Sequence, residues 1–316
     1  MNLRSWGMNW VKMNLKSNSP HNAVCAFLIS YMSGLILTLQ GDQKKKKIPI
    51  RIVTSSERNL IRLRIWLGYH LCKTFGSSGL CRFGLRTVVK FTPVTRFAEA
   101  ANMEFIASHT GIPVPHIHDV FTIGSQTYIV MDYIDAPDLA HTWGKLTVVQ
   151  RQRIFVQLKD YITQMRSLEP SQPGAIQAAD GTGLFDKRIC QNNGHFGPFA
   201  SVGEFHEYFG HGCIRALENH RQYWPQLRTM AQKRYRTVFS HSDISPRNVL
   251  ARGGEILAIV DWEGAGWYPE YWEYTRWAVS NYLSSQMWHN ARDEIMDIYP
   301  DELEIENYIG SVYTRL

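Results

Sequence analysis

Apolar and polar residues follow two different periods along this chain, and the change between them predicts its elements. Residues 86–91 (RTVVKF) are rich in β-branched side chains and lie between Gly84 and Pro93, which is typical of a strand. Residues 118–134 contain two further apolar runs, separated by a turn signal at 124–125. They therefore predict two consecutive strands.

Helical spacing dominates the regions between and after these strands. Residues 97–109 place apolar side chains on one face and predict a helix that ends before the prolines of 111–117. Residues 146–168 predict a long helix, and residues 204–236 a further helical region. Short apolar strands are expected at 237–239, 249–251 and 256–260, before an aromatic-rich helical segment.

The order of these elements predicts an α+β protein with two lobes. A small N-terminal lobe with an antiparallel sheet would occupy residues 76–134, and a larger, mainly helical C-terminal lobe residues 135–316. The joint between them is expected near residues 131–137. Residues 1–75 are interpreted as a basic extension whose degree of order the pattern leaves open.

Charge divides the chain into two regions. Residues 1–90 contain 15 lysines and arginines against 2 acids, a net charge of +13, and the remaining residues carry 19 against 26, a net −7. The basic region would suit contacts with anionic membranes, nucleic acid or nucleotide phosphates. The acidic residues 91–316 would suit metal ions or cationic substrates. The four lysines at 44–47 are too short a run to indicate nucleic-acid binding, so nucleic acid is not an expected partner.

Residues 23–39 form an uncharged, mostly apolar run of 17 residues. A helix that crosses a bilayer needs about 20 such residues, with roughly 17 as the lower limit. Basic residues flank the run on both sides, so charge does not fix an orientation. Two alternatives follow: a membrane contact through residues 23–47, or a segment that packs on the protein or stays poorly ordered.

The five cysteines are scattered and form no CxxC pair. They indicate neither a zinc site nor a disulfide framework. A reducing compartment suits such a chain, so we expect a cytoplasmic protein.

Polar side chains with a fixed spacing gather in residues 239–274. His241, Asp243 and Asn248 follow the pattern His-x-Asp-x4-Asn, and Asp261 ends the apolar run that follows. Phosphoryl transfer needs such groups, because Mg²⁺ prefers oxygen ligands and the attacking hydroxyl must give its proton to a carboxylate. A hairpin between Asn248 and Asp261 would bring these oxygens together, with His241 bracing the loop.

This segment resembles the catalytic and metal-binding loops of the aminoglycoside phosphotransferase and choline kinase-like family, which has a protein-kinase-like fold. Residues 261–274 (DWEGAGWYPEYWEY) are similar to the fungal members in particular. The resemblance extends over roughly residues 80–290. It implies that Asp243 is the catalytic base and that Asn248 and Asp261 are magnesium ligands. The family usually has glycine where this chain has Ser242.

The resemblance also implies a nucleotide site before residue 135. Lys90 lies in the VVKF strand, where a buried cation would hold the ATP phosphates, and it needs a carboxylate partner. Glu99 fits that partner by its pattern better than the alternative, Glu104. Backbone groups near Asp132 and Ile134 resemble the hinge that binds adenine.

The phosphate-binding loop is the weakest part of this resemblance. Residues 75–85 contain three glycines and no GxGxxG motif, which leaves the phosphate contacts undefined.

Several residues near Asp261 have two interpretations. The aromatic side chains would either line a substrate pocket or pack in the core, for which core packing is the default. They are Trp262, Trp267, Tyr268, Tyr271, Trp272 and Tyr274. Glu263, Glu270 and Glu273 would either attract a cationic substrate or brace the loop by hydrogen bonds.

The leading hypothesis is an enzyme that uses ATP and Mg²⁺ to phosphorylate a hydroxyl of a small molecule. The alternative is a catalytically silent kinase-like binding module, which the lack of a GxGxxG motif allows. The retention of Lys90, Asp243, Asn248 and Asp261 favours the enzyme.

Overall fold

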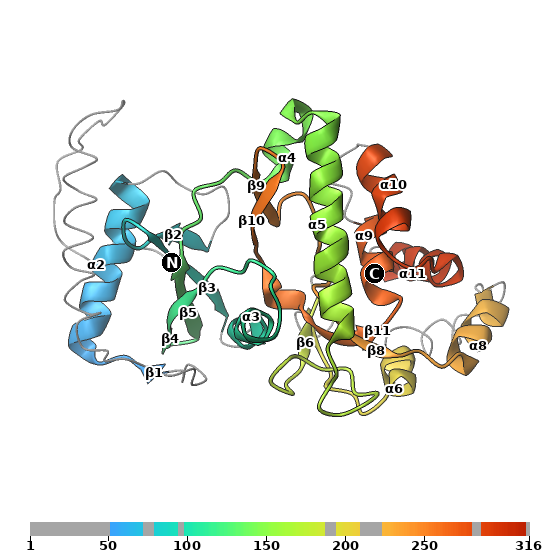
Figure 1. Cartoon of the computed structure of the whole chain (residues 1–316). Coiled ribbons are helices and arrows are strands. Elements are labelled where there is room, and N and C mark those ends of the chain that lie inside the picture. Colours follow the sequence, from blue (N-terminus) through green and yellow to red (C-terminus); the bar gives the residue numbers. More distant parts are fainter. Residues whose placement is uncertain are drawn as a thin grey trace.

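The computed structural model describes residues 51–71, 79–93, 98–186, 194–208, 223–279 and 286–313. Within them the chain forms two lobes, with a sheet and two helices in one and most of the helices in the other (Figure 1). The apolar run at 23–39 and the lysines at 44–47 lie outside the described residues.

The N-terminal lobe is built on a five-stranded sheet with the order β1-β4-β5-β3-β2. Every neighbouring pair is antiparallel except β1 with β4, which is parallel. The predicted strand at 86–91 and the two predicted strands of 118–134 are confirmed. The strands are β1 (Arg51–Ile52), β2 (Leu80–Arg82), β3 (Thr87–Pro93), β4 (Ile117–Ile123) and β5 (Gln126–Asp132).

The two faces of this sheet pack against different parts of the molecule, because successive side chains of a strand point to opposite sides. Val89 and Val130 lie in an apolar cluster with Ile61 of helix α2 (Ser55–Leu71). Val88 and Met131 lie on the other face, in the cluster that continues through helix α3 (Ala98–His109) into the C-terminal lobe. The second face is therefore the one turned toward the C-terminal lobe.

Residues 51–71 form part of the N-terminal lobe, whereas the sequence analysis assigned them to the extension. Strand β1 pairs with β4, and α2 buries Ile61 against the sheet. A reciprocal pair begins α2: the backbone amide of Thr54 donates to the Glu57 carboxylate, and the amide of Glu57 donates to the Thr54 hydroxyl. This Thr-x-x-Glu pattern is a start signal that the sequence analysis missed.

The C-terminal lobe is mainly helical and carries three short two-stranded sheets. The predicted long helix is α5 (Val148–Ser167), and a Thr147–Gln150 capping box fixes its start. The predicted short strands are β8 (Thr237–Ser240), β9 (Val249–Arg252) and β10 (Glu255–Ile259), and β9 and β10 form the expected hairpin. The other elements are α4 (Leu139–Thr142), η2 (Trp143–Lys145), β6 (Leu184–Phe185), β7 (His195–Phe196), α6 (Val202–His206), α8 (Trp224–Gln232), η6 (Trp262–Gly264), β11 (Gly266–Pro269), α9 (Trp272–Val279), α10 (Gln286–Ile295) and α11 (Pro300–Tyr313).

The aromatic residues after Asp261 form the core of this lobe. All six that the sequence singled out are buried, and Trp262 and Trp272 are fully buried. Tyr268 and Trp272 stack with ring centroids 4.9 Å apart. These rings therefore pack in the core, and the alternative of an open substrate pocket lined by them is wrong.

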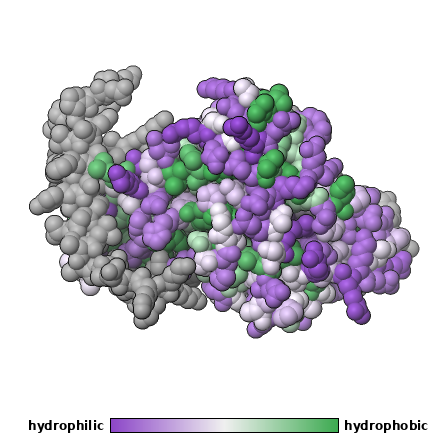
Figure 2. All heavy atoms as spheres, viewed as in Figure 1, coloured by the Kyte–Doolittle hydropathy of each residue, from purple (hydrophilic) through white to green (hydrophobic). Residues whose placement is uncertain are grey.

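The outer surface is mostly polar on the face shown in Figure 2, with small separate apolar areas. No helix of the described segments combines the length and the apolar composition that a bilayer crossing needs.

Candidate active site

The catalytic loop connects β8 to β9 and carries Asp243 and Asn248. The Asn248 amide nitrogen donates to the Asp243 backbone carbonyl and to its carboxylate, both at 2.9 Å. Because both partners are acceptors, the nitrogen must face them, and the Asn248 side-chain oxygen is left for another partner. The hairpin then brings Asp261 near: the backbone amide of Val260 donates to the Asn248 carbonyl at 2.9 Å.

Ser242 precedes the candidate base in a left-handed backbone conformation, with φ of 70°. Residues other than glycine rarely adopt it, which explains why glycine is usual here in the family. Three contacts of 2.9 Å hold Ser242: its amide donates to Glu273, its hydroxyl accepts from Trp272, and its carbonyl accepts from Arg276. The C-terminal lobe thus fixes the backbone just before Asp243.

His241 is fully buried and braces the loop as expected. Its Nδ1 accepts from the Asp243 amide at 3.2 Å, so the tautomer with hydrogen on Nε2 donates to the Val260 carbonyl at 3.1 Å. Burial lowers the pKa of His241, which keeps the ring neutral in this role.

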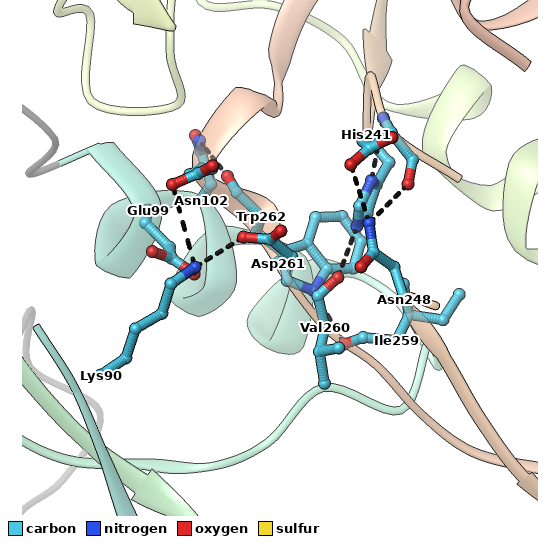
Figure 3. A network of polar contacts seen from close by, with 11 residues as sticks. Lys90, Glu99, Asn102, His241, Asn248, Ile259, Val260, Asp261 and Trp262 are labelled. Carbon is cyan, nitrogen blue, oxygen red and sulfur yellow. Dashed lines mark hydrogen bonds and ion pairs between the residues drawn. The ribbon is translucent and has the colours of Figure 1, made fainter. Parts of the chain in front are cut away.

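Lys90 lies at the centre of a charged cluster that joins the two lobes (Figure 3). Its Nζ donates to Glu99 Oε1 at 2.7 Å and to Asp261 Oδ1 at 2.6 Å, and lies 4.0 Å from Glu263 Oε2. Glu99, rather than Glu104, is therefore the partner of Lys90. The cluster assembles Lys90 from β3, Glu99 from α3, Asp261 from the end of the loop after β10, and Glu263 from η6 (Trp262–Gly264).

The charged groups of this cluster shift one another's pKa values. Burial alone would lower the pKa of Lys90, but the nearby carboxylates of Glu99 and Asp261 outweigh it and raise that pKa. Burial raises the pKa of Glu99 to about 7, against the opposing effect of Lys90. Lys90 is thus a permanent cation, and the carboxylates around it carry more negative charge than it neutralises.

Asn102 ties the loop of Asp261 to the N-terminal lobe. It is fully buried on α3, and its amide nitrogen donates to the carbonyls of Trp262 at 3.1 Å and Ala265 at 2.7 Å. Its oxygen accepts from the Ala179 amide at 2.9 Å. The sequence analysis missed Asn102, although a polar residue on the inner face of α3, three positions after Glu99, is a usable signal.

Asp261 is the second non-glycine residue with left-handed backbone in the described segments, with φ of 69°. Such conformations cost about 1–3 kcal/mol and collect at functional sites. Asp261 and Ser242 thus mark the two loops that carry the predicted metal ligands and base.

The donor set of these loops fits magnesium. The Asn248 side-chain oxygen faces away from its two bonded acceptors, and the quarter-exposed Asp261 carboxylate extends from the hairpin. Mg²⁺ takes one or two such oxygens and completes its shell with phosphate and water.

The hinge lies between the lobes at residues 132–134. The Tyr133 amide donates to the Arg86 carbonyl at 2.7 Å, and the Asp132 side chain accepts from His118 at 2.7 Å. In the described segments the amide of Ile134 has no hydrogen-bond partner, so it is available to a ligand. Of the predicted phosphate loop at 75–85, residues 75–78 lie outside the described residues.

The three glutamates near Asp261 brace the structure. Glu273 holds Ser242, and Glu263 lies beside Lys90. Glu270 accepts from the amide and the guanidinium of Arg236, at 3.1 and 2.9 Å. Bracing is therefore the interpretation that the contacts support, rather than attraction of a cationic substrate.

Comparison with solved structures identifies similar folds. The gentamicin complex of APH(2")-IIa is 11% identical over 81% of this chain and 86% of that one, with a TM-score of 0.50. A thermostable mutant of aminoglycoside phosphotransferase APH(4)-Ia, with ADP and hygromycin B, is 14% identical over 83% and 98%, with a TM-score of 0.49. Macrolide 2'-phosphotransferase MphH from Brachybacterium faecium is 15% identical over 79% and 88%, also with a TM-score of 0.49. The predicted two-lobe, protein-kinase-like α+β fold is confirmed.

Sequence comparison assigns the family. No curated protein matches the chain. A sequence model described as the phosphotransferase enzyme family matches residues 81–304, which include both loops and Lys90. The prediction of a small-molecule kinase is confirmed at the level of this family. Since the match extends over well more than half of its length, the chain belongs to the phosphotransferase enzyme family.

Proposed function

We propose that this protein transfers the γ-phosphate of ATP, with Mg²⁺, to a hydroxyl group of a small-molecule acceptor. The observation that carries the proposal is the meeting of Lys90, Glu99 and Asp261 from both lobes, beside the Asp243–Asn248 pair. Phosphoryl transfer depends on such positioning and on neutralising charge, with little covalent chemistry for the protein.

Each residue has one assigned role. Asn248 and Asp261 would hold Mg²⁺, which supplies positive charge next to the transferred phosphate when bound. Lys90, kept in place by Glu99, binds the α- and β-phosphates. Asp243 accepts the hydrogen bond, and then the proton, of the attacking hydroxyl.

The hinge binds the adenine base. The Asp132 carbonyl accepts from the exocyclic amine, and the available Ile134 amide donates to a ring nitrogen. This pair of backbone contacts fixes the base while Lys90 holds the phosphates, so the γ-phosphate is directed toward Asp243.

The test is ATP turnover with Mg²⁺ over a pooled library of hydroxylated metabolites, with Asp243→Asn as the matched variant. We expect phosphorylated product from the wild type, a loss of about 10²–10⁴-fold in Asp243→Asn, and similar ATP binding by both. Equal transfer by the variant would refute the assigned base. ATP binding by the wild type without product from a broad library would favour the catalytically silent binding module.

We also propose a cytoplasmic enzyme, with residues 23–47 as a membrane contact. The scattered cysteines and the apolar run next to four lysines support these two assignments. Fractionation of the full chain beside a chain without residues 1–47 tests the contact. Recovery of both in the supernatant without detergent would contradict it.

A further inference from the structure

Arg82 lies on the face of the sheet that is turned toward the C-terminal lobe. In the ladder it is opposite Val88 of β3, which is opposite Met131 of β5. Side chains directly opposite each other in antiparallel strands share a face. Leu80 is opposite Lys90 in the same ladder, so Arg82 and Lys90 point to the same side.

The guanidinium of Arg82 covers the hinge. Its Cζ lies 3.4 Å from the ring centroid of Tyr133, the residue between the two proposed adenine contacts. Its Nη1 is buried and has no hydrogen-bond partner within the described segments. A buried N–H without an acceptor is costly, so an arginine whose Nη1 is held in this way is prepared for an acceptor that the described residues do not supply.

Helix α2 fixes the backbone that carries Arg82. A Cβ on Gly68 would lie 1.9 Å from the Arg82 carbonyl oxygen, so only glycine permits this approach of helix to strand. One turn earlier, the buried Arg64 donates to the Phe83 carbonyl at 2.8 Å and stacks on the Phe83 ring at 3.6 Å. Helix α2 therefore holds Arg82 and Phe83 from the face of the sheet that is turned away from the C-terminal lobe.

The level of Arg82 along the sheet indicates which part of a nucleotide it would meet. Val88 and Lys90 are two residues apart on β3, about 7 Å, and Val88 is the one nearer the hinge, since Thr87 pairs with Asp132. Lys90 is thus at the level of the phosphates and Arg82 at the level of the base and ribose.

We propose that Arg82 is a nucleotide-binding residue that donates hydrogen bonds to the nucleoside part of ATP, and that α2 positions it through Gly68 and Arg64. This inference rests on the proposed function, because it presupposes that the protein binds ATP. It adds a side-chain contact to a site whose base recognition otherwise depends on backbone groups alone.

The experiment measures the Kd of adenosine and of Mg·ATP by isothermal titration. Arg82→Ala should weaken both ligands by the same factor, about tenfold, since a hydrogen bond from a charged group is lost in each complex. Arg86→Ala is the matched control, because it removes the same charge from an exposed side chain of the same hairpin, and it should stay within about twofold. Lys90→Met should weaken Mg·ATP by a larger factor than adenosine.

The outcomes separate the two proposals. Unchanged adenosine binding by Arg82→Ala, or equal losses in Arg82→Ala and Arg86→Ala, overturns the role of Arg82 while ATP binding by the wild type stands. No binding of Mg·ATP by the wild type overturns the proposed function as well. If Arg82→Ala melts early without ligand, Arg82→Lys replaces it: we expect normal melting and weaker adenosine binding, and unchanged affinity would refute the proposal.

Discussion

The two loops of the site are stabilised from different parts of the molecule. The catalytic loop is held inside the C-terminal lobe, where Glu273 lies only 31 residues from its partner Ser242. The loop of Asp261 is held by the N-terminal lobe, by Lys90 from 171 residues away and by Asn102, whose partner Trp262 is 160 residues away. The catalytic loop, with Asp243 and Asn248, therefore depends on one lobe, and the loop of Asp261 depends on the assembly of both.

This difference suits the chemistry of phosphoryl transfer. The base needs a fixed position relative to the acceptor. The left-handed backbone at Ser242 and three hydrogen bonds to that residue provide it. The metal and the phosphates must instead be aligned with a nucleotide that contacts both lobes. Changes in the N-terminal lobe should consequently alter nucleotide binding, and changes around Ser242 should alter turnover.

The largest expected effect comes from Lys90→Met. It leaves the buried Glu99, together with Asp261 and Glu263, without the cation between them. Breaking such a cluster costs about 3–5 kcal/mol, which we expect in the free energy of unfolding in denaturant at pH 7. The double variant Lys90→Met/Glu99→Gln should recover part of the loss, and a double variant no more stable than Lys90→Met would contradict a charge-based origin.

Folding stability should fall in acid, because the buried His206 must be protonated. Burial lowers the pKa of His206 to about 4, and its Nε2 lies 3.0 Å from the hydroxyl of Tyr271, next to Trp272. The native state then binds fewer protons than the unfolded state between pH 4 and 6.5. Stability from this group is present above pH 6.5 and is lost as pH falls toward 4, by about 3 kcal/mol.

His206→Gln tests this pH dependence, because glutamine keeps a polar partner for Tyr271 and does not titrate. The slope of unfolding free energy against pH between 4 and 6.5 should become shallower in the variant. Parallel curves for the two proteins would show that His206 does not cause the acid loss.

The sequence predicted the parts of the site that depend on local patterns. Asp243 and Asn248 share one loop and Asp261 ends the adjoining strand, so spacing was enough to bring these three together. Glu99 was assigned as the partner of Lys90 by the family resemblance. Strands β3, β4, β5, β8, β9 and β10 followed from apolar runs in the same way, and helices α3 and α5 from helical periodicity. The sequence analysis did not predict β1, β2, β6, β7 or β11.

The parts that the sequence analysis missed depend on distant partners. The place of Asn102 on the inner face of α3 marks it as a polar core residue, but the sequence does not indicate which carbonyl, 160 residues away, it binds. Helix α2 was not predicted because its inner face includes the buried Arg64 and Gly68, which interrupt the apolar pattern that marks a packed helix.

The smallest expected effect distinguishes strain from bonding at Ser242. Ser242→Ala keeps the strained backbone and loses the hydroxyl that accepts from Trp272, so about 1–2 kcal/mol of stability should be lost. Ser242→Gly loses the same bond and also relieves the left-handed conformation, so it should be about 1 kcal/mol more stable than Ser242→Ala. Equal stability of the two in thermal unfolding would mean that strain there is negligible.

The claim that the two loops are stabilised from different parts of the molecule is tested most directly with two variants, Asn102→Ala and Glu273→Ala. The Kd of Mg·ATP and magnesium-dependent ATP turnover are measured on the same samples of each. Asn102→Ala releases the loop of Asp261 from α3 and should weaken Mg·ATP about tenfold or more. Glu273→Ala releases the catalytic loop, which carries both Asp243 and the proposed metal ligand Asn248, so it should reduce turnover by a larger factor than it raises the Kd of Mg·ATP. Equal losses of Mg·ATP affinity in both variants would contradict the separate support of the two loops.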